Sequence, residues 1–302
     1  MERRLRIKIG PKQAGKTVEQ VLKTEAGLSR RQISRLKFQE GGIRASNRQV
    51  RVTHVLTEGE ILEILLEEAE EGSVHLKRGE ANLSILYEDE DLAAVNKPAG
   101  LVVHPSPGHY RDSLANQLVA YYRDQGQEVR VRSIGRLDKD TSGVLLFGKH
   151  GVSAAKLCRQ REEQIYQRWY LALAWGKFRK KTGKLTGKIG PCPGEKKKMA
   201  VTVDGKTAVT HYQVLYQAEG YALLACRLET GRTHQIRVHM AHAGHPLLGD
   251  PIYGKGDSCP RLMLHAWKVR CVQPFTGEAL EICAPVPREM EELCREWMNQ
   301  QQ

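Results

Sequence analysis

A segment bounded by glycines carries one acid between two cations, Gly135-Arg136-Leu137-Asp138-Lys139-Asp140-Thr141-Ser142-Gly143. Residues 131–134 before it have the composition of a short strand, and the apolar run at 144–147 that of a buried strand. Asp138 is therefore predicted on a loop at the rim of a sheet, where functional sites are usually assembled. Aspartate also shapes turns by accepting hydrogen bonds from its own backbone. From these residues alone, Asp138 could be either a reactive acid or an acid that only shapes the turn.

Three segments, taken in order, resemble the motifs of one enzyme family. Arg136-Leu137-Asp138-Lys139-Asp140-Thr141-Ser142-Gly143 resembles the catalytic motif of the RluA/RluD family of RNA pseudouridine synthases. Residues 85–89 and 95–105 resemble the family's first motif, and Thr230-Gly231-Arg232-Thr233-His234-Gln235-Ile236-Arg237-Val238-His239 resembles its third. Three ordered motifs are far more specific than one. Gly135 departs from the pattern, since the family usually has His immediately before Arg-Leu-Asp.

The resemblance implies roles for individual residues. Asp138 matches the single essential aspartate, and Arg237 matches the arginine that pairs with it and favours its charged form. Because a lone buried Arg is costly, these two residues are expected to need each other. Tyr170 matches the tyrosine whose ring packs on the uracil, with Arg168 where Lys is usual; without the resemblance, a core tyrosine is the simpler interpretation. Arg136 matches the arginine that can occupy the vacated base stack.

The implied reaction converts uridine in RNA to pseudouridine. It breaks the N1–C1′ bond, rotates the uracil and rejoins it through C5, with no change of redox state, so we expect no cofactor. The target base must be extruded from the stack at a cost of a few kcal/mol. Asp138 could attack the sugar or the base, or act as a base at C2′, and the sequence leaves these three routes open.

Composition agrees with an RNA partner. The 302 residues include 47 Lys and Arg against 35 Asp and Glu, a formal net charge of +12, which suits a polyanion or an anionic membrane surface. No apolar run approaches the roughly 18 residues of a spanning helix, and the first six residues lack the apolar core of a signal peptide. The chain is therefore expected to be a cytoplasmic protein without a membrane partner, and we expect a monomer.

No metal site is predicted. The seven cysteines include no Cys-x-x-Cys pair and have an odd total, so neither a zinc ribbon nor a disulfide framework is indicated. His234, His239, His242 and His245 cluster in sequence, but they lack the His-Glu-x-x-His pattern and an acidic companion.

The positive charge is concentrated near the N-terminus. Residues 1–55 hold 14 Lys and Arg and 4 Asp and Glu, so +10 of the +12 lies there. Ser29 and Gln32 form a capping-box signature for a helix that presents Ile33 and Leu36 on one side and its arginines largely elsewhere. With a second short helix from Thr17 and strands near 43–44, 50–52 and 61–64, residues 1–66 resemble the S-four-type (αL) RNA-binding domain. A solvated basic helix is the alternative.

The residues predicted to contact RNA are Arg30, Arg31, Arg35, Arg136 and Arg232.

The rest of the chain divides at an acidic stretch. Residues 67–81 are predicted to be a linker, and residues 82–302 the catalytic domain. Short apolar runs alternate there with helical segments at 113–119 and 152–157, and Thr233 is predicted to cap a helix carrying Ile236, Met240 and Ala243. The pattern and the resemblance favour an α+β fold with a mixed, mainly antiparallel central sheet. The lysines at 196–198 could contact RNA or be solvated.

Two other classes of function remain open at this point. A catalytically silent RNA-binding or ribosome-assembly factor would need the same basic N-terminal segment. A glycosidase would need two carboxylates of divided role, and Asp140 is the only second acid near Asp138. Among RNA substrates, the resemblance favours large-subunit ribosomal RNA, while tRNA-modifying relatives share the same motifs.

Overall fold

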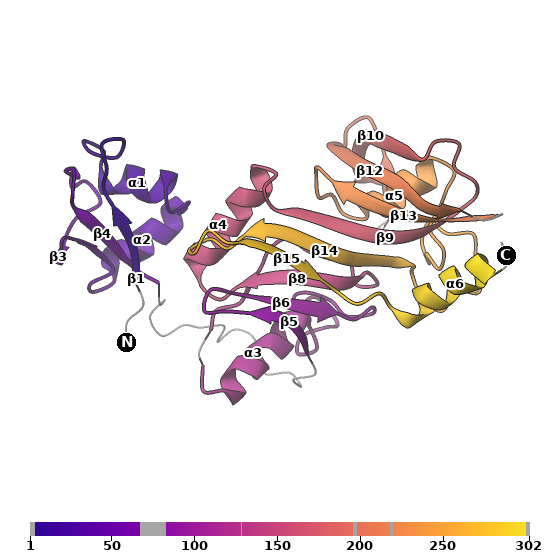
Figure 1. Cartoon of the computed structure of the whole chain (residues 1–302), viewed down its shortest axis with the longest axis horizontal. Helices are drawn as coiled ribbons and strands as arrows, with labels where there is room; N and C mark the ends of the chain where they lie inside the picture. Colours follow the sequence, from indigo (N-terminus) through magenta and orange to yellow (C-terminus); the bar gives the residue numbers. More distant parts are fainter. Residues whose placement is uncertain (1–3, 67–82, 128, 196–197, 218–219, 300–302) are drawn as a thin grey trace.

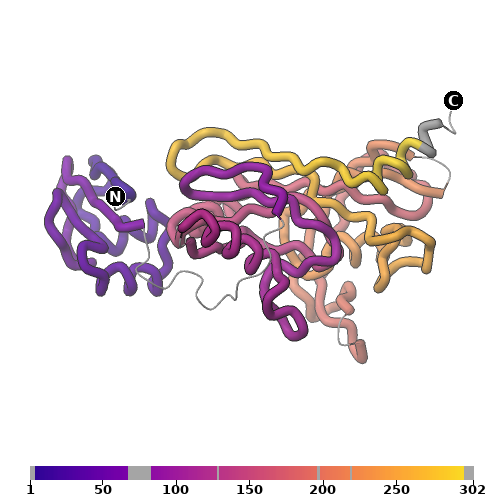
Figure 2. The backbone as a smooth tube through the Cα atoms, turned by 90° about the horizontal axis from the view of Figure 1, so that it is seen from below, coloured from indigo at the N-terminus to yellow at the C-terminus, as the bar shows by residue number. Residues whose placement is uncertain are grey.

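The computed structural model describes residues 4–66, 83–127, 129–195, 198–217 and 220–299 of the 302-residue chain. They form a small N-terminal module and a larger α+β domain built on one extended sheet (Figure 1). The predicted linker and two of the three lysines at 196–198 lie outside the described residues. In Figure 2 the N-terminal module occupies one end of the molecule and the C-terminal segment the other.

The N-terminal module packs two short helices against a four-stranded antiparallel sheet of order β1-β4-β2-β3. Its elements are β1 (Arg4–Lys8), α1 (Val18–Thr24), α2 (Arg30–Phe38), β2 (Ile43–Ala45), β3 (Arg48–Gln49) and β4 (Ile61–Leu65). The predicted strand at 50–52 is wrong, because the chain turns there and the His54 amide donates to the Arg51 carbonyl at 3.0 Å. The sequence analysis also missed β1, in which cations alternate with Leu5 and Ile7.

Both predicted helix starts in this module are confirmed. Ser29 and Gln32 close a capping box at the start of α2, and Thr17 caps α1 in the same way. Ile33 and Leu36 are buried in the module's core. Arg30, Arg31 and Arg35 are exposed, so the charged and apolar sides of α2 are separated as the periodicity predicts.

The large sheet has eleven strands, ordered β11-β10-β12-β13-β9-β14-β8-β6-β5, with β15 paired to β14 and β7 paired to β8. Among the described strands only the β14–β8 pair is parallel, so the expected mixed, mainly antiparallel sheet is confirmed. The strands are β5 (Ser84–Glu88), β6 (Leu92–Lys97), β7 (Arg132–Ser133), β8 (Ser142–Gly148), β9 (Gln167–Trp175), β10 (Thr182–Pro191), β11 (Met199–Val201), β12 (Lys206–Gln217), β13 (Tyr221–Leu228), β14 (Leu264–Val272) and β15 (Ala279–Cys283). The helices of this domain are α3 (Leu114–Asp124), α4 (Gly151–Glu162), α5 (Gln235–His242) and α6 (Arg288–Asn299).

Helix α4 connects the module to the large domain. Figure 1 shows it between α1 and α2 on one side and the end of the large sheet on the other. The Gln32 side chain donates to the Gly151 carbonyl at the start of α4 at 2.9 Å, and Val152 packs into the module's apolar core. Near the other end of α4, Arg159 donates to the Thr24 carbonyl. The two domains therefore meet along one helix.

Strand β8 fixes the loop that carries Asp138. Every residue of β8 is buried, as expected for its apolar run. Gly143 has φ +110, and a Cβ there would lie 2.2 Å from the Ala266 carbonyl oxygen of β14. Only glycine lets the two parallel strands approach this closely.

Among the described residues, no helix combines the length and the apolar character that crossing a bilayer requires.

Gly143→Ala should destabilise the chain by at least ~2 kcal/mol more than Gly126→Ala, because overpacking adds to backbone strain. Gly126 is the matched control, since it also has positive φ (+70) but nothing within 4 Å of an added Cβ. Denaturant unfolding of both variants measures the difference. Equal losses would mean that the close approach of β14 does not constrain position 143.

Candidate active site

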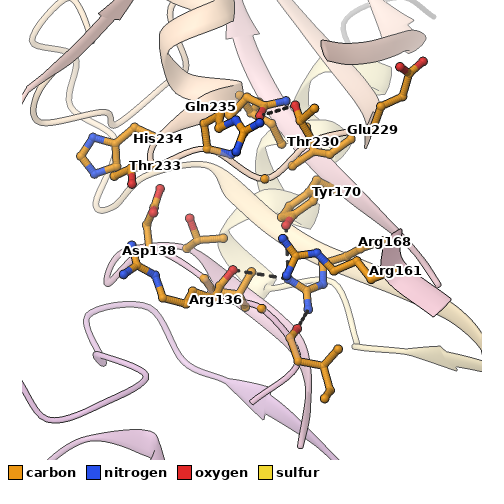
Figure 3. Close-up of a pocket in the computed structure, with 18 of the residues that line it drawn as sticks. Arg136, Asp138, Arg161, Arg168, Tyr170, Glu229, Thr230, Thr233, His234 and Gln235 are labelled. Carbon is orange, nitrogen blue, oxygen red and sulfur yellow. Dashed lines mark hydrogen bonds between the residues drawn. The ribbon is translucent and has the colours of Figure 1, made fainter. Parts of the chain in front are cut away.

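A cavity of about 820 Å³ gathers the segments that the sequence analysis singled out. Its walls come from residues 134–138 of the loop before β8, from the end of α4 and from β9 (Figure 3). Residues 228–237, which run from the end of β13 into the first turn of α5, complete them. Asp138, Tyr170 and Arg237 all line it, as do Arg136 and Arg232. The exposed arginines of α2 do not. Residues about 100 positions apart in the sequence, such as Asp138 and Arg237, thus line one cavity.

Asp138 offers an accessible carboxylate to this cavity. Its side chain is 24% exposed, and the Thr141 amide donates to its backbone carbonyl at 3.2 Å, closing the turn. Asp140 is not among the residues that line the cavity. Asp140 therefore does not supply the second carboxylate that a glycosidase would need beside Asp138 in the cavity.

Arg237 has a different main partner from the one expected. Its Nε and Nη2 donate to the two carboxylate oxygens of Asp250 at 2.8 and 2.7 Å, while its Nη1 lies 3.9 Å from Asp138 Oδ2. The expected proximity to Asp138 is present. However, the argument that Arg237 and Asp138 need each other for charge balance is wrong, because Asp250 supplies the buried counter-charge.

Asp250 is fixed by its surroundings. Its buried carboxylate also accepts from the Ile252 and Tyr253 amides at 2.9 and 3.1 Å. Burial acts to raise the pKa of Asp250, but the hydrogen bonds and charge of Arg237 outweigh it and hold that pKa below its usual range. Asp250 was not predicted from the sequence as a residue of the site. The signal available was an acid between Gly249 and Pro251, in a turn that follows the helix of Arg237.

The segment before α5 is anchored differently from the prediction. The N-cap is His234, with φ +55 and no side-chain cap, so the predicted Thr233 cap is wrong. The Gln235 side chain takes over instead, accepting from the Arg232 amide at 3.0 Å and donating to the Val209 carbonyl at 2.9 Å. Ile236 is buried as expected, whereas Ala243 is exposed.

Tyr170 and Arg168 form the β9 wall. Tyr170 is buried, and its hydroxyl lies 3.5 Å from Arg168 Nη1. Arg168 also donates to the Ile134 carbonyl at 3.0 Å, to the Tyr166 hydroxyl at 2.7 Å and to the Arg136 carbonyl at 3.4 Å. Figure 3 draws these bonds from Arg168 toward the loop of Asp138. Arg168 therefore ties that loop to the sheet.

The RNA pseudouridylate synthase family profile matches residues 91–242, about half of the chain and the part that holds Asp138, Tyr170 and Arg237. The chain belongs to this family. It is 39% identical over 307 residues to the uncharacterized RNA pseudouridine synthase YhcT of Bacillus subtilis, with 98% of each chain covered. It is also 40% identical over 252 residues to the ribosomal large subunit pseudouridine synthase D of Nitrosomonas europaea, covering 80% of this chain and 72% of that one.

The fold agrees with solved members. The structure of human RNA pseudouridylate synthase domain containing 1 matches with a TM-score of 0.56 and 26% identity, covering 72% of this chain and 95% of that one. The chain is thus an RNA pseudouridine synthase with the α+β fold expected from its sequence. Membership in a family of enzymes speaks against a silent RNA-binding factor.

In this synthase a lysine of the first motif, Lys97, donates a hydrogen bond to the turn that carries Asp138. Lys97 is fully buried, and its Nζ donates to the carbonyls of Pro98, Leu101 and Lys139 at 2.8, 2.7 and 2.8 Å. Burial lowers the pKa of Lys97 to about 7, although Asp140 and Asp138 act to raise it. Three carbonyl acceptors match the three protons of the ammonium group. The buried Lys97 side chain therefore links β6 to the residue after Asp138.

No group of three or more His, Cys, Asp or Glu side chains within the described ranges could hold a metal ion. Three of the four clustered histidines form hydrogen bonds with separate partners. His234 bonds to the Tyr253 hydroxyl, His239 to the Thr210 hydroxyl and His245 to the Trp175 carbonyl. That the synthase needs no cofactor stays a prediction.

Asp250→Asn should destabilise the synthase by ~3–5 kcal/mol at pH 7, because it leaves the Arg237 charge buried with a neutral partner. The native pKa of Asp250 is below its unfolded value, so this stabilisation is complete above about pH 4 and is lost as the pH falls through the native pKa. The free energy of unfolding should be measured for wild type and variant from pH 7 to pH 3. The difference between the two should decrease as the pH falls below about 4.

The control for this experiment is Asp112→Asn, which changes an acid that is 60% exposed in its ion pair with His109. We expect little change of stability in that variant. A pH-independent gap for Asp250→Asn would contradict the assignment of Asp250 as the charged partner.

Proposed function

We propose that Asp138 carries the isomerisation of uridine to pseudouridine in structured RNA, with large-subunit ribosomal RNA as the substrate. One observation carries the assignment: among the acids of the loop, Asp138 alone turns a half-open carboxylate into the cavity, beside the guanidinium of Arg237. Because Asp250 already holds Arg237, the guanidinium is oriented before any substrate binds. Asp138 is thereby free to form and break bonds.

The chemistry needs room for an extruded nucleotide. The cavity's volume lies within the range of small-molecule sites. In the reaction the N1–C1′ bond breaks, a C5–C1′ bond forms, the proton leaves C5, and N1 gains a proton, so the atoms balance without a cofactor. Asp138 serves as nucleophile or as the base at C2′.

The neighbouring residues then have distinct tasks. Tyr170, held by β9, packs against the uracil. Arg136, exposed at the rim two residues before the acid, enters the stack that the base has left. Arg232 contributes a further cation at the rim, although its Nε already donates to the Thr207 carbonyl at 3.0 Å.

Capture of the RNA falls to the N-terminal module, which we propose to be an αL-type RNA-binding domain spanning residues 1–66, joined by a linker to the catalytic domain at 82–302. Its support is the exposed basic side of α2, opposite the buried Ile33 and Leu36, and the +10 charge of residues 1–55. Relatives named as large-subunit synthases favour ribosomal RNA over tRNA. A monomeric state and a cytoplasmic location stay predictions.

Asp138→Asn should lower isomerisation by more than about a hundredfold while RNA affinity changes little, because it removes the reactive carboxylate and keeps its size. Tritium released from C5-labelled uridine in a large-subunit ribosomal RNA transcript measures the reaction. Asp140→Asn is the matched control, an identical change two residues away and outside the cavity. Turnover near wild type in Asp138→Asn would refute the assignment.

Replacing Arg30, Arg31 and Arg35 together by Ala should weaken binding to long structured RNA. It should also reduce the log–log salt slope of the affinity by about 2–3 units, because each phosphate contact contributes about 0.7–0.9. Turnover at saturating RNA should fall much less. The control is Arg288→Ala with Arg295→Ala, which removes two exposed charges from α6 at the other end of the molecule (Figure 1). An unchanged slope in the triple variant would show that this side of α2 is only solvated.

A further inference from the structure

The cavity holds one more guanidinium, that of Arg161, besides those of Arg136, Arg168, Arg232 and Arg237. Arg161, on the last turn of α4, lines the cavity and is exposed. Within the described part of the chain, its side chain forms no hydrogen bond and no ion pair. The other arginines are already engaged: Arg237 by Asp250, Arg168 by carbonyl and hydroxyl oxygens, and Arg232 by the Thr207 carbonyl. Apart from Arg136, Arg161 is the free cation of this site.

Two glycines make the place that Arg161 occupies. A Cβ on Gly135 would lie 3.1 Å from Arg161 Nη1, and a Cβ on Gly231 would lie 2.9 Å from Nη2. The guanidinium therefore rests between the backbone of the Asp138 loop and the backbone of the segment before α5. Position 135 is where the chain departs from the family's usual His. The departure has a consequence, because a side chain there would compete with Arg161 for this space.

The charges around Arg161 leave it available to an anion. Glu229, also at the cavity, is engaged, since its Oε1 accepts from His211 at 2.5 Å and lies 3.4 Å from the Lys184 ammonium. Glu162 also lines the cavity, but among the described residues it forms no ion pair with Arg161.

We propose that Arg161 binds a backbone phosphate of the RNA strand next to the extruded nucleotide. The inference rests on the proposed function, in which the sugar of that nucleotide must reach Asp138 and its flanking phosphates must follow it to the rim. An unpaired, planar guanidinium suits a phosphate, which it can hold with two parallel hydrogen bonds. Arg161 projects from α4, the helix that packs against the N-terminal module. The same helix therefore connects the module that captures the RNA with the arginine that positions it.

The test compares Arg161→Ala with Arg288→Ala on a large-subunit ribosomal RNA transcript, by affinity at several salt concentrations and by single-turnover isomerisation at saturating RNA. Arg161→Ala should weaken binding about tenfold and lower the salt slope by somewhat under one unit. Its single-turnover rate at saturating RNA should fall by a smaller factor than its affinity. Arg288→Ala, 86% exposed on α6, should change neither quantity. Unchanged affinity and slope in Arg161→Ala, or a loss confined to the rate, would overturn the proposal.

A second variant tests the geometry. Gly231→Ala should displace the flexible end of Arg161 and weaken binding in the wild-type background, but have little effect when Arg161 is already Ala. Equal effects in both backgrounds would show that position 231 acts by another route and would overturn the placement. If the wild type binds the transcript and leaves its uridines unchanged, the proposed function fails, while the comparison of Arg161 variants still reports on phosphate binding.

Discussion

The buried pair of Arg237 and Asp250 is the interaction on which the site depends. A guanidinium that is 2% exposed needs a counter-charge, and Asp250 provides it with two hydrogen bonds of 2.8 Å or less. If Asp138 were the only acid nearby, it would be consumed in balancing Arg237. The inner pair separates two tasks that a single carboxylate could not perform together: neutralising a buried cation and reacting with a substrate.

The fold brings the pieces of this site together by pairing strands that are distant in sequence. The Asp138 loop is pinned from three directions: by the parallel approach of β14 at Gly143, by Arg168 from β9, and by the buried ammonium of Lys97. Helix α4 adds the link to the N-terminal module, because its first turn packs against that module while its last turn reaches the cavity. The RNA-binding module proposed here is thus held in place by an element that also shapes the active site.

Local signals predicted local structure well. Residues within one or two turns of each other determine the start of the helix after Thr17, the capping box at Ser29, the buried strand after the Asp138 turn and the two sides of α2. The prediction failed at Thr233, where a contact with a distant strand decides, and at 50–52, where a local turn forms. Gln235 replaces a side-chain cap by bonding to β12, and a strand-like composition at 50–52 yields to a turn. Asp250 was missed because its partnership with Arg237 is a tertiary contact.

A strongly basic composition does not by itself show which cations serve the substrate. The arginines around the cavity differ in whether the surrounding protein provides them with hydrogen-bond acceptors. Carbonyls and a buried acid immobilise Arg168 and Arg237, and both then act as parts of the scaffold. Glycine at 135 and 231 offers space without a polar side chain, so Arg161 gains a position but no partner. An unpaired cation is stable at the rim because water solvates it, and it gains most when an anion replaces that water. The distribution of glycines in the motifs therefore determines which charges remain available to RNA.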